Sequence, residues 1–123
     1  MNKSQILKSA KEVLTIESKA INDLAKSLNN DFFNAVKSIE SLKGKLIISG
    51  VGKSGNIASK IAASFTSTGI PSVFLNPVDA SHGDMGIVRA EDILIVLSNS
   101  GDSHELSDLL DFAKRKSVKH KLL

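Results

Sequence analysis

The chain has 123 residues, 41% of them hydrophobic and 24% charged, which suits one globular domain of common size. It contains no cysteine, which excludes disulfide scaffolds, cysteine-ligated zinc and thiol nucleophiles, and its apolar runs are far shorter than the ~20 residues of a membrane span. The net charge of +3 would suit nucleic-acid binding, but residues 1–113 are mildly acidic and the basic excess lies at Lys114, Arg115, Lys116, Lys119 and Lys121. The absence of Trp and Tyr also leaves no aromatic platform for single strands, so we expect neither nucleic-acid nor membrane binding. We therefore expect a cytoplasmic protein.

Two amphipathic helices are predicted at the N-terminus. Over residues 3–28 apolar side chains recur every three or four positions, interrupted at Glu17, which predicts one long helix. Residues 29–31 supply a stop and a cap, and a second apolar stripe follows that ends at Gly44. We expect these helices to form a helical hairpin over residues 1–43. Periodicity leaves open whether the first stripe packs on the chain's own sheet or serves a dimer interface.

From residue 44 onward, short apolar runs alternate with helical patterns. Buried strands are predicted to begin at Leu46, Ser72 and Ile93, with helices after the first and third. This alternation predicts right-handed crossovers and a parallel sheet, and so an α/β fold with about three strands. Residues 117–123 lack the apolar run that a fourth strand would need, which predicts an early end to the domain and exposed sheet edges.

The ligand site of an open parallel sheet lies beyond the carboxyl ends of its strands, where three polar loops are expected here. The first reads GVGKSG at residues 50–55. It satisfies GxGxxG, a weak signal, but the second predicted strand has no acidic residue at its tip for a ribose, and Ile47 stands where a Walker motif needs glycine. The glycines would let the backbone approach an anion beside the cation of Lys53. The alternative is a plain turn with Lys53 in solvent.

The third loop reads SNSGDS at residues 98–103 and puts hydroxyls and backbone N–H groups at a helix N-terminus. Hydroxyls and free N–H groups at a helix N-terminus are typical of a phosphate-binding loop. Because the hydroxyls are neutral, the ligand that fits best is a phosphomonoester whose negative charge is stabilised by the helix dipole. The alternative makes Asp102 or Ser103 an ordinary helix cap and the other serines turn residues.

The middle loop and the start of the last helix add two titratable candidates. His82, among the small residues of DASHGDMG, can donate to a sugar hydroxyl or titrate near neutral pH, and a role in merely capping the loop is an equal alternative. Glu105 should lie in a first helical turn, within reach of Lys53 across adjacent strand ends. Its ordinary interpretation is a surface carboxylate at a helix N-terminus.

Together, GVGKSG, NPVDASHGDMG and LSNSGDSHE after successive strands resemble the sugar isomerase (SIS) domain, most closely the arabinose-5-phosphate isomerases of the Kdo branch of lipopolysaccharide synthesis. The resemblance runs from the N-terminal helices to about residue 117. It implies a flavodoxin-like sheet, a phosphosugar ligand, a homo-oligomer and no cofactor. For the site, it implies substrate binding by Ser54, His82, Ser98, Ser100 and Ser103, and catalytic positions for Lys53 and Glu105.

The resemblance also implies what to expect of organisation and activity. Asn76 stands where related enzymes often have a zinc-linked histidine, so we predict no metal site. Family members continue beyond Leu123 through more strands, further catalytic residues and usually CBS domains. We therefore expect a truncated protein, with N-terminal helices over 1–43, a partial SIS core over 44–123 and no CBS domains.

The expected function is interconversion of arabinose 5-phosphate and ribulose 5-phosphate, in a form that is truncated and need not be active. This reaction moves a proton between C1 and C2 through an enediolate. We assign acid–base catalysis to Glu105 and stabilisation of the negative charge on the enediolate to Lys53. The alternatives are a non-catalytic phosphosugar-binding SIS module and a decayed fragment that folds poorly.

Overall fold

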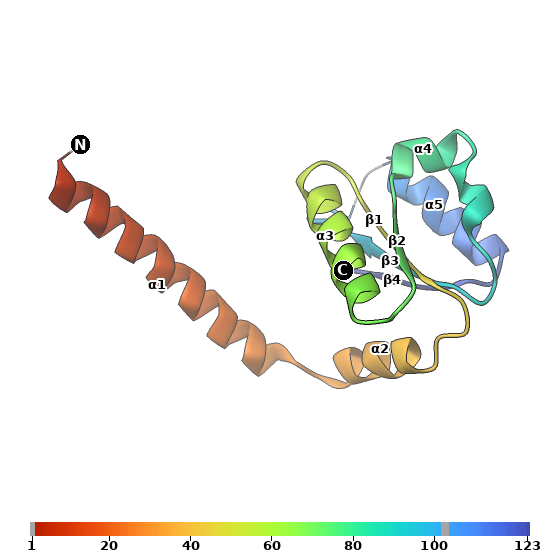
Figure 1. The fold of residues 1–123 in the computed structure, drawn as a ribbon, viewed down its shortest axis with the longest axis horizontal. Helices are drawn as coiled ribbons and strands as arrows, with labels where there is room; N and C mark the ends of the chain where they lie inside the picture. The colour runs from red at the N-terminus through yellow and green to blue at the C-terminus, as the bar shows by residue number, and fades with distance from the viewer. Residues whose placement is uncertain (1, 102–103) are drawn as a thin grey trace. The chain divides into compact units, whose positions relative to one another are not determined.

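A computed structural model describes residues 2–101 and 104–123 (Figure 1). The chain divides into two units, residues 1–37 and 38–123, which are described separately. Among the described residues, no helix combines the length and the apolar character needed to cross a membrane. In chain order the elements are α1 (Lys3–Ser27), α2 (Asn30–Glu40), β1 (Leu46–Gly50), α3 (Lys53–Ser67), β2 (Ser72–Leu75), α4 (Pro77–Ser81), the 3-10 helix η1 (Asp84–Ile87), β3 (Ile93–Leu97), α5 (His104–Arg115) and β4 (Lys119–Leu122).

Both predicted N-terminal helices are present, and an asparagine immediately before each one caps it. Asn2 and Gln5 form a capping box, in which the Asn2 side chain accepts from the Gln5 N–H and the Gln5 side chain accepts from the Asn2 N–H. The Asn29 side chain accepts from the Asp31 N–H at 2.9 Å, as the predicted stop and cap require. Neither helix contains a buried residue.

The second unit is a parallel four-stranded sheet with the order β2-β1-β3-β4. Leu46 of β1 pairs with Ser72 of β2 and with Ile93 of β3, so the three strands predicted from the sequence form one continuous ladder. The prediction of about three strands was one short, because β4 pairs in parallel with β3. Most of its side chains are exposed, as an edge strand allows, so no apolar run marks it in the sequence.

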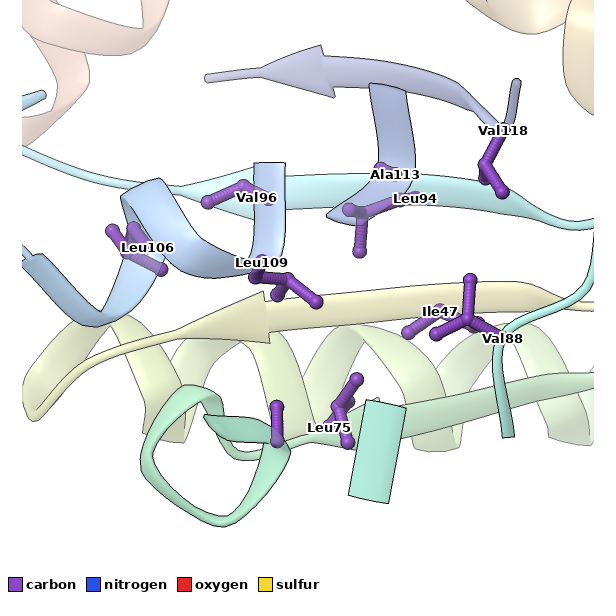
Figure 2. Packing of buried hydrophobic residues seen from close by; sticks show 10 residues of the cluster. Ile47, Leu75, Val88, Leu94, Val96, Leu106, Leu109, Ala113 and Val118 are labelled. Carbon is purple, nitrogen blue, oxygen red and sulfur yellow. The ribbon is translucent and has the colours of Figure 1, made fainter. Parts of the chain in front are cut away.

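The core lies on both faces of the sheet, because successive strand residues point to opposite sides. Leu46 and Ile48 of β1 face the layer of α3, where they pack with Ala58 and Ala62. Ile47 faces the opposite layer, which α4 and α5 cover (Figure 1). Figure 2 shows this second cluster, in which strand residues meet the apolar stripe of α5: Ile47, Leu75, Val88, Leu94, Val96, Leu106, Leu109, Ala113 and Val118.

A buried carboxylate joins β1 to β3 at the amino ends of the strands. Asp92 is 3% exposed and accepts hydrogen bonds from the Lys45 N–H at 2.9 Å, the Lys45 Nζ at 2.6 Å and the Arg89 N–H at 2.8 Å. Burial acts to raise the pKa of the Asp92 carboxyl, but these hydrogen bonds and the charge of Lys45 together hold it below its usual value of 3.8. The ionised form is therefore the one that the fold stabilises.

Candidate functional site

The sheet places the three polar loops at one edge. All four strands are parallel, so the chain leaves β1, β2 and β3 on the same side of the sheet. The order β2-β1-β3-β4 reverses direction between β1 and β3. In open α/β sheets this switch point is where ligands bind, because the connections depart to opposite faces and leave a crevice. The loops after β1 and β3 flank it.

The loop after β1 turns tightly into α3. Gly52 has a φ of 58°, a left-handed conformation that favours glycine, and no side chain caps the helix that follows. The first intrahelical hydrogen bond runs from the Gly55 N–H to the Val51 carbonyl, so the amides of Lys53 and Ser54 precede it. The positive end of the α3 dipole and the ammonium of Lys53 thus belong to the same turn, an arrangement that favours an anion.

Two other glycines of this loop are required by close backbone approach. A Cβ on Gly55 would lie 2.6 Å from the Gly50 carbonyl oxygen, and a Cβ on Gly50 would lie 2.9 Å from the Ser54 carbonyl oxygen. The first turn of α3 is therefore pressed against the end of β1. The GxGxxG pattern here has a packing cause that is independent of any nucleotide.

The loop after β3 is tied to the sheet through Ser98. Its N–H donates to the Leu123 carbonyl at 2.7 Å, and its hydroxyl oxygen accepts from the Gly101 N–H at 2.9 Å, with Gly101 at a φ of 70°. Ser98 therefore fills the turn role that was its alternative interpretation, while its hydroxyl proton can still be donated. Ser100 is exposed in the same loop. Asp102 and Ser103 lie outside the described residues, so their predicted roles stay predictions.

A pocket of about 320 Å³ lies at the switch point, between α3 and the end of β3. Lys53 and Ser54 from the loop after β1 and Ser98 from the loop after β3 all line it. The accessible wall of this pocket is almost entirely apolar, although Lys53 and Ser54 border it on one side and Ser98 and Asn99 on the other. The further lining residues, which were not predicted from the sequence, are Ile57, Leu97, Asn99 and Leu123.

Two of these four residues carry a signal in the sequence. Ile57 lies one helical turn after Lys53, a spacing that puts both on the same face of α3. Asn99 lies inside the loop already singled out for its serines. Leu123 carried no such signal, because its place beside the loop depends on the pairing of β4 with β3.

The other two predicted residues lie outside this pocket. His82 is exposed at the C-terminal end of α4, where its backbone N–H donates to the Asp79 carbonyl at 3.0 Å. Glu105 is half-buried in the first turn of α5. Neither lines the pocket, and in the described part of the chain no hydrogen bond or ion pair joins Glu105 to Lys53. Their catalytic and sugar-binding roles stay predictions.

The segment after β2 is built as a short helix. The Asn76 side chain caps α4 by accepting from the Val78 N–H at 3.0 Å. The Ser81 hydroxyl donates to Asp108 of α5 at 3.4 Å, a contact that joins the two helices on this face of the sheet. No group of His, Asp and Glu side chains suited to a metal ion occurs among residues 2–101 and 104–123.

The fold and this site define the chain as an open α/β protein whose candidate anion pocket lies at the switch point of its sheet. The model of the SIS domain matches residues 39–122. The chain belongs to the SIS domain family.

Relatives agree with this assignment. Arabinose 5-phosphate isomerase KdsD of Yersinia pestis is 44% identical over 108 residues, which are 88% of this chain and 33% of that protein. An uncharacterized protein of Rickettsia prowazekii is 43% identical over 110 residues, 89% of this chain and 34% of that protein. The solved structure of an Escherichia coli CFT073 protein in complex with arabinose 5-phosphate is 38% identical with a TM-score of 0.92, covering 99% of this chain and 65% of that one. The chain thus spans about a third of the length of these curated relatives.

Proposed function

We propose that this chain supplies the phosphosugar-binding part of an aldose–ketose isomerase that acts on arabinose 5-phosphate. The observation that carries the proposal is the switch-point pocket, which brings Lys53 and Ser54 of α3 to Ser98 of the next loop. Relatives named as arabinose 5-phosphate isomerases and a similar structure solved with that sugar phosphate support this substrate. We also place the protein in the cytoplasm, as a homo-oligomer, in the Kdo branch of lipopolysaccharide synthesis.

The phosphate would bind across the pocket between two helix N-termini. The hydroxyls of Ser54, Ser98, Ser100 and Ser103 would donate to its oxygens, while the dipole of α3 and the ammonium of Lys53 offset its charge. The aliphatic wall formed by Ile57 and the other lining residues would exclude water from one side of the ligand.

The chemical step moves a proton between C1 and C2 of the sugar. A base removes the proton from one carbon, an enediolate forms, and the proton returns to the other carbon while the oxygens exchange theirs. Glu105 would hold that proton, and Lys53 would stabilise the negative charge on the enediolate oxygen. His82 would contact the sugar hydroxyls.

A binding module without turnover is the second candidate. It is favoured by one observation, namely that Lys53 lines the pocket while Glu105 does not. In that case the residues above would hold the phosphosugar and nothing would carry the proton between its carbons.

Thermal unfolding with and without arabinose 5-phosphate, combined with a coupled isomerase assay, tests both candidates. At a hundredfold excess over its Kd, the ligand should stabilise the fold by about 2.7 kcal/mol and raise Tm by several degrees. Lys53→Ala should lose most of that shift, and turnover should fall about a hundredfold if Lys53 stabilises the enediolate. Lys60→Ala, an exposed lysine of the same helix outside the pocket, should retain both.

The outcomes separate the two candidates. Turnover that Lys53→Ala abolishes would establish the isomerase, whereas a Tm shift without turnover would establish the binding module. A wild-type chain whose Tm ignores the sugar phosphate would contradict both.

A further inference from the structure

Ile57 is a large apolar side chain of α3 that the core does not cover. The buried residues of this helix, which face the sheet, are Gly55, Ala58 and Ala62. Ile61 packs against the core cluster beneath α3, but Ile57, one turn earlier on the same side of the helix, is 58% exposed and lines the switch-point pocket. Ile57 is therefore available to a ligand in the pocket.

The side chains of the pocket offer hydrogen bonds at its border but not along its aliphatic wall. Lys53 and Ser54 border it on one side and Ser98 on the other, and these groups suit a phosphate. Ile57 and Leu97 belong to the wall, and their side chains carry neither a donor nor an acceptor. A phosphate ester held at the border therefore has one side against aliphatic side chains.

Such a wall distinguishes phosphate esters by the carbon that carries the phosphate. A terminal carbon continues into one chain of the molecule, and that chain can lead away from the wall. An inner carbon continues into two chains, so one of them lies against the wall when the other leaves the pocket. In a sugar this second chain carries hydroxyls, and a hydroxyl that loses water without gaining a hydrogen bond costs free energy. The wall thus favours esters of terminal carbons.

We propose that Ile57 is a specificity-determining residue, which makes the site select phosphate esters of terminal carbons over esters of inner carbons. The inference rests on the proposed function, because that function places the phosphate at Lys53, Ser54 and Ser98. It adds the class of ligand, primary phosphomonoesters, and the side chain that selects them. Arabinose 5-phosphate carries its phosphate on the last carbon and is a member of this class. Sugars phosphorylated at the anomeric carbon are disfavoured.

Two isomers of glycerol phosphate test the selection in the wild-type protein. Glycerol 1-phosphate and glycerol 2-phosphate have the same atoms and the same charge, but the phosphate is on a terminal carbon in the first and on the inner carbon in the second. Isothermal titration calorimetry should give a Kd about tenfold lower for glycerol 1-phosphate, because one hydroxyl of the other isomer is left without a partner. Equal Kd values, or tighter binding of glycerol 2-phosphate, would overturn the proposal.

Ile57→Val and Ile57→Thr form a matched pair of variants, since valine and threonine have the same shape and threonine replaces a methyl group by a hydroxyl. Ile57 is exposed, so neither substitution disturbs the core. Ile57→Val keeps an aliphatic wall and should keep the preference for glycerol 1-phosphate. Ile57→Thr offers the second chain a hydrogen-bond partner and should reduce the preference to about twofold or less. The same ratio of Kd values in both variants would show that Ile57 does not select the ligand.

Failure of this inference is distinguishable from failure of the proposed function. Lys53→Ala should weaken the binding of both isomers by the same factor and leave their ratio unchanged, because the phosphate is common to them. If the wild type binds arabinose 5-phosphate but does not prefer glycerol 1-phosphate, the proposed function stands and the role of Ile57 is wrong. If the wild type binds none of the three phosphate esters, the proposed function is wrong, and this inference with it.

Discussion

Asp92→Ala is expected to lower the free energy of unfolding by about 3 kcal/mol. The substitution removes the acceptor of three hydrogen bonds and leaves the Lys45 N–H, the Arg89 N–H and the Lys45 ammonium without it. The ammonium is 28% exposed and can turn toward water, which keeps the expected loss below that of a fully buried ion pair. Urea unfolding at pH 7, followed by circular dichroism, measures it.

The same carboxylate gives stability a dependence on pH. Its pKa in the folded chain lies below the usual value of 3.8, so folding favours the ionised form. The stabilisation is complete only well above pH 3.8, and it is lost as the pH falls through that value and then through the folded-state pKa. The wild type should therefore lose more stability than Asp92→Ala between about pH 5 and the acid end of the titration. Unfolding curves of both proteins collected over that pH range test the direction of this pH dependence.

Asp111→Ala is the matched control for this prediction. Its carboxylate also pairs with a lysine, Lys114 at 3.5 Å, but the side chain is 59% exposed. Water screens such a pair, so the expected change is below about 0.5 kcal/mol. Equal effects of Asp92→Ala and Asp111→Ala would show that the buried hydrogen bonds do not stabilise the sheet.

Gly55→Ala is expected to cost about 2 to 3 kcal/mol and to disturb the pocket. The new Cβ would lie 2.6 Å from the Gly50 carbonyl oxygen, which is backbone of the central strand β1 and cannot rotate away. The first turn of α3 would have to move outward, taking Lys53 and Ser54 with it. Unfolding measurements give the stability, and the Tm shift with arabinose 5-phosphate reports on the pocket.

Gly86→Ala separates this steric effect from the general effect of replacing glycine. A Cβ on Gly86 would meet no atom within 4 Å, and its φ is not in the left-handed region. Alanine there should be neutral or stabilise slightly, since it restricts the unfolded chain. If Gly55→Ala were as well tolerated as Gly86→Ala, the contact between α3 and β1 would not be as tight as described.

The elements with a strong local pattern were predictable. Apolar side chains at helical spacing predicted α1. The short apolar runs at residues 72–75 and 93–97 predicted β2 and β3 with their observed bounds. The motifs of three polar loops after successive strands predicted membership of the SIS domain family, and the match of the SIS model to residues 39–122 confirms it. Helices, strands and loop motifs depend on residues that are close together in the chain, so the spacing of apolar and polar residues predicts them.

The predictions that were incomplete concern contacts that no local pattern specifies. β4 is held by backbone hydrogen bonds to β3, and its exposed lysines give no apolar run. The two helices predicted for residues 1–43 are present as α1 and α2, and neither contains a buried residue. An apolar stripe indicates that a helix needs a partner but does not identify it.

Local patterns in the chain are enough to predict the parallel α/β class, the loops that carry the site and the glycines that a tight turn needs. Which loop residues lie next to one another depends on the three-dimensional fold. It brought Lys53 and Ser54 to Ser98 in one pocket and left His82 and Glu105 outside it. The reason is that strand order, and with it the switch point between β1 and β3, is set by pairing between segments far apart in the chain. The local spacing of apolar residues does not predict which strands pair.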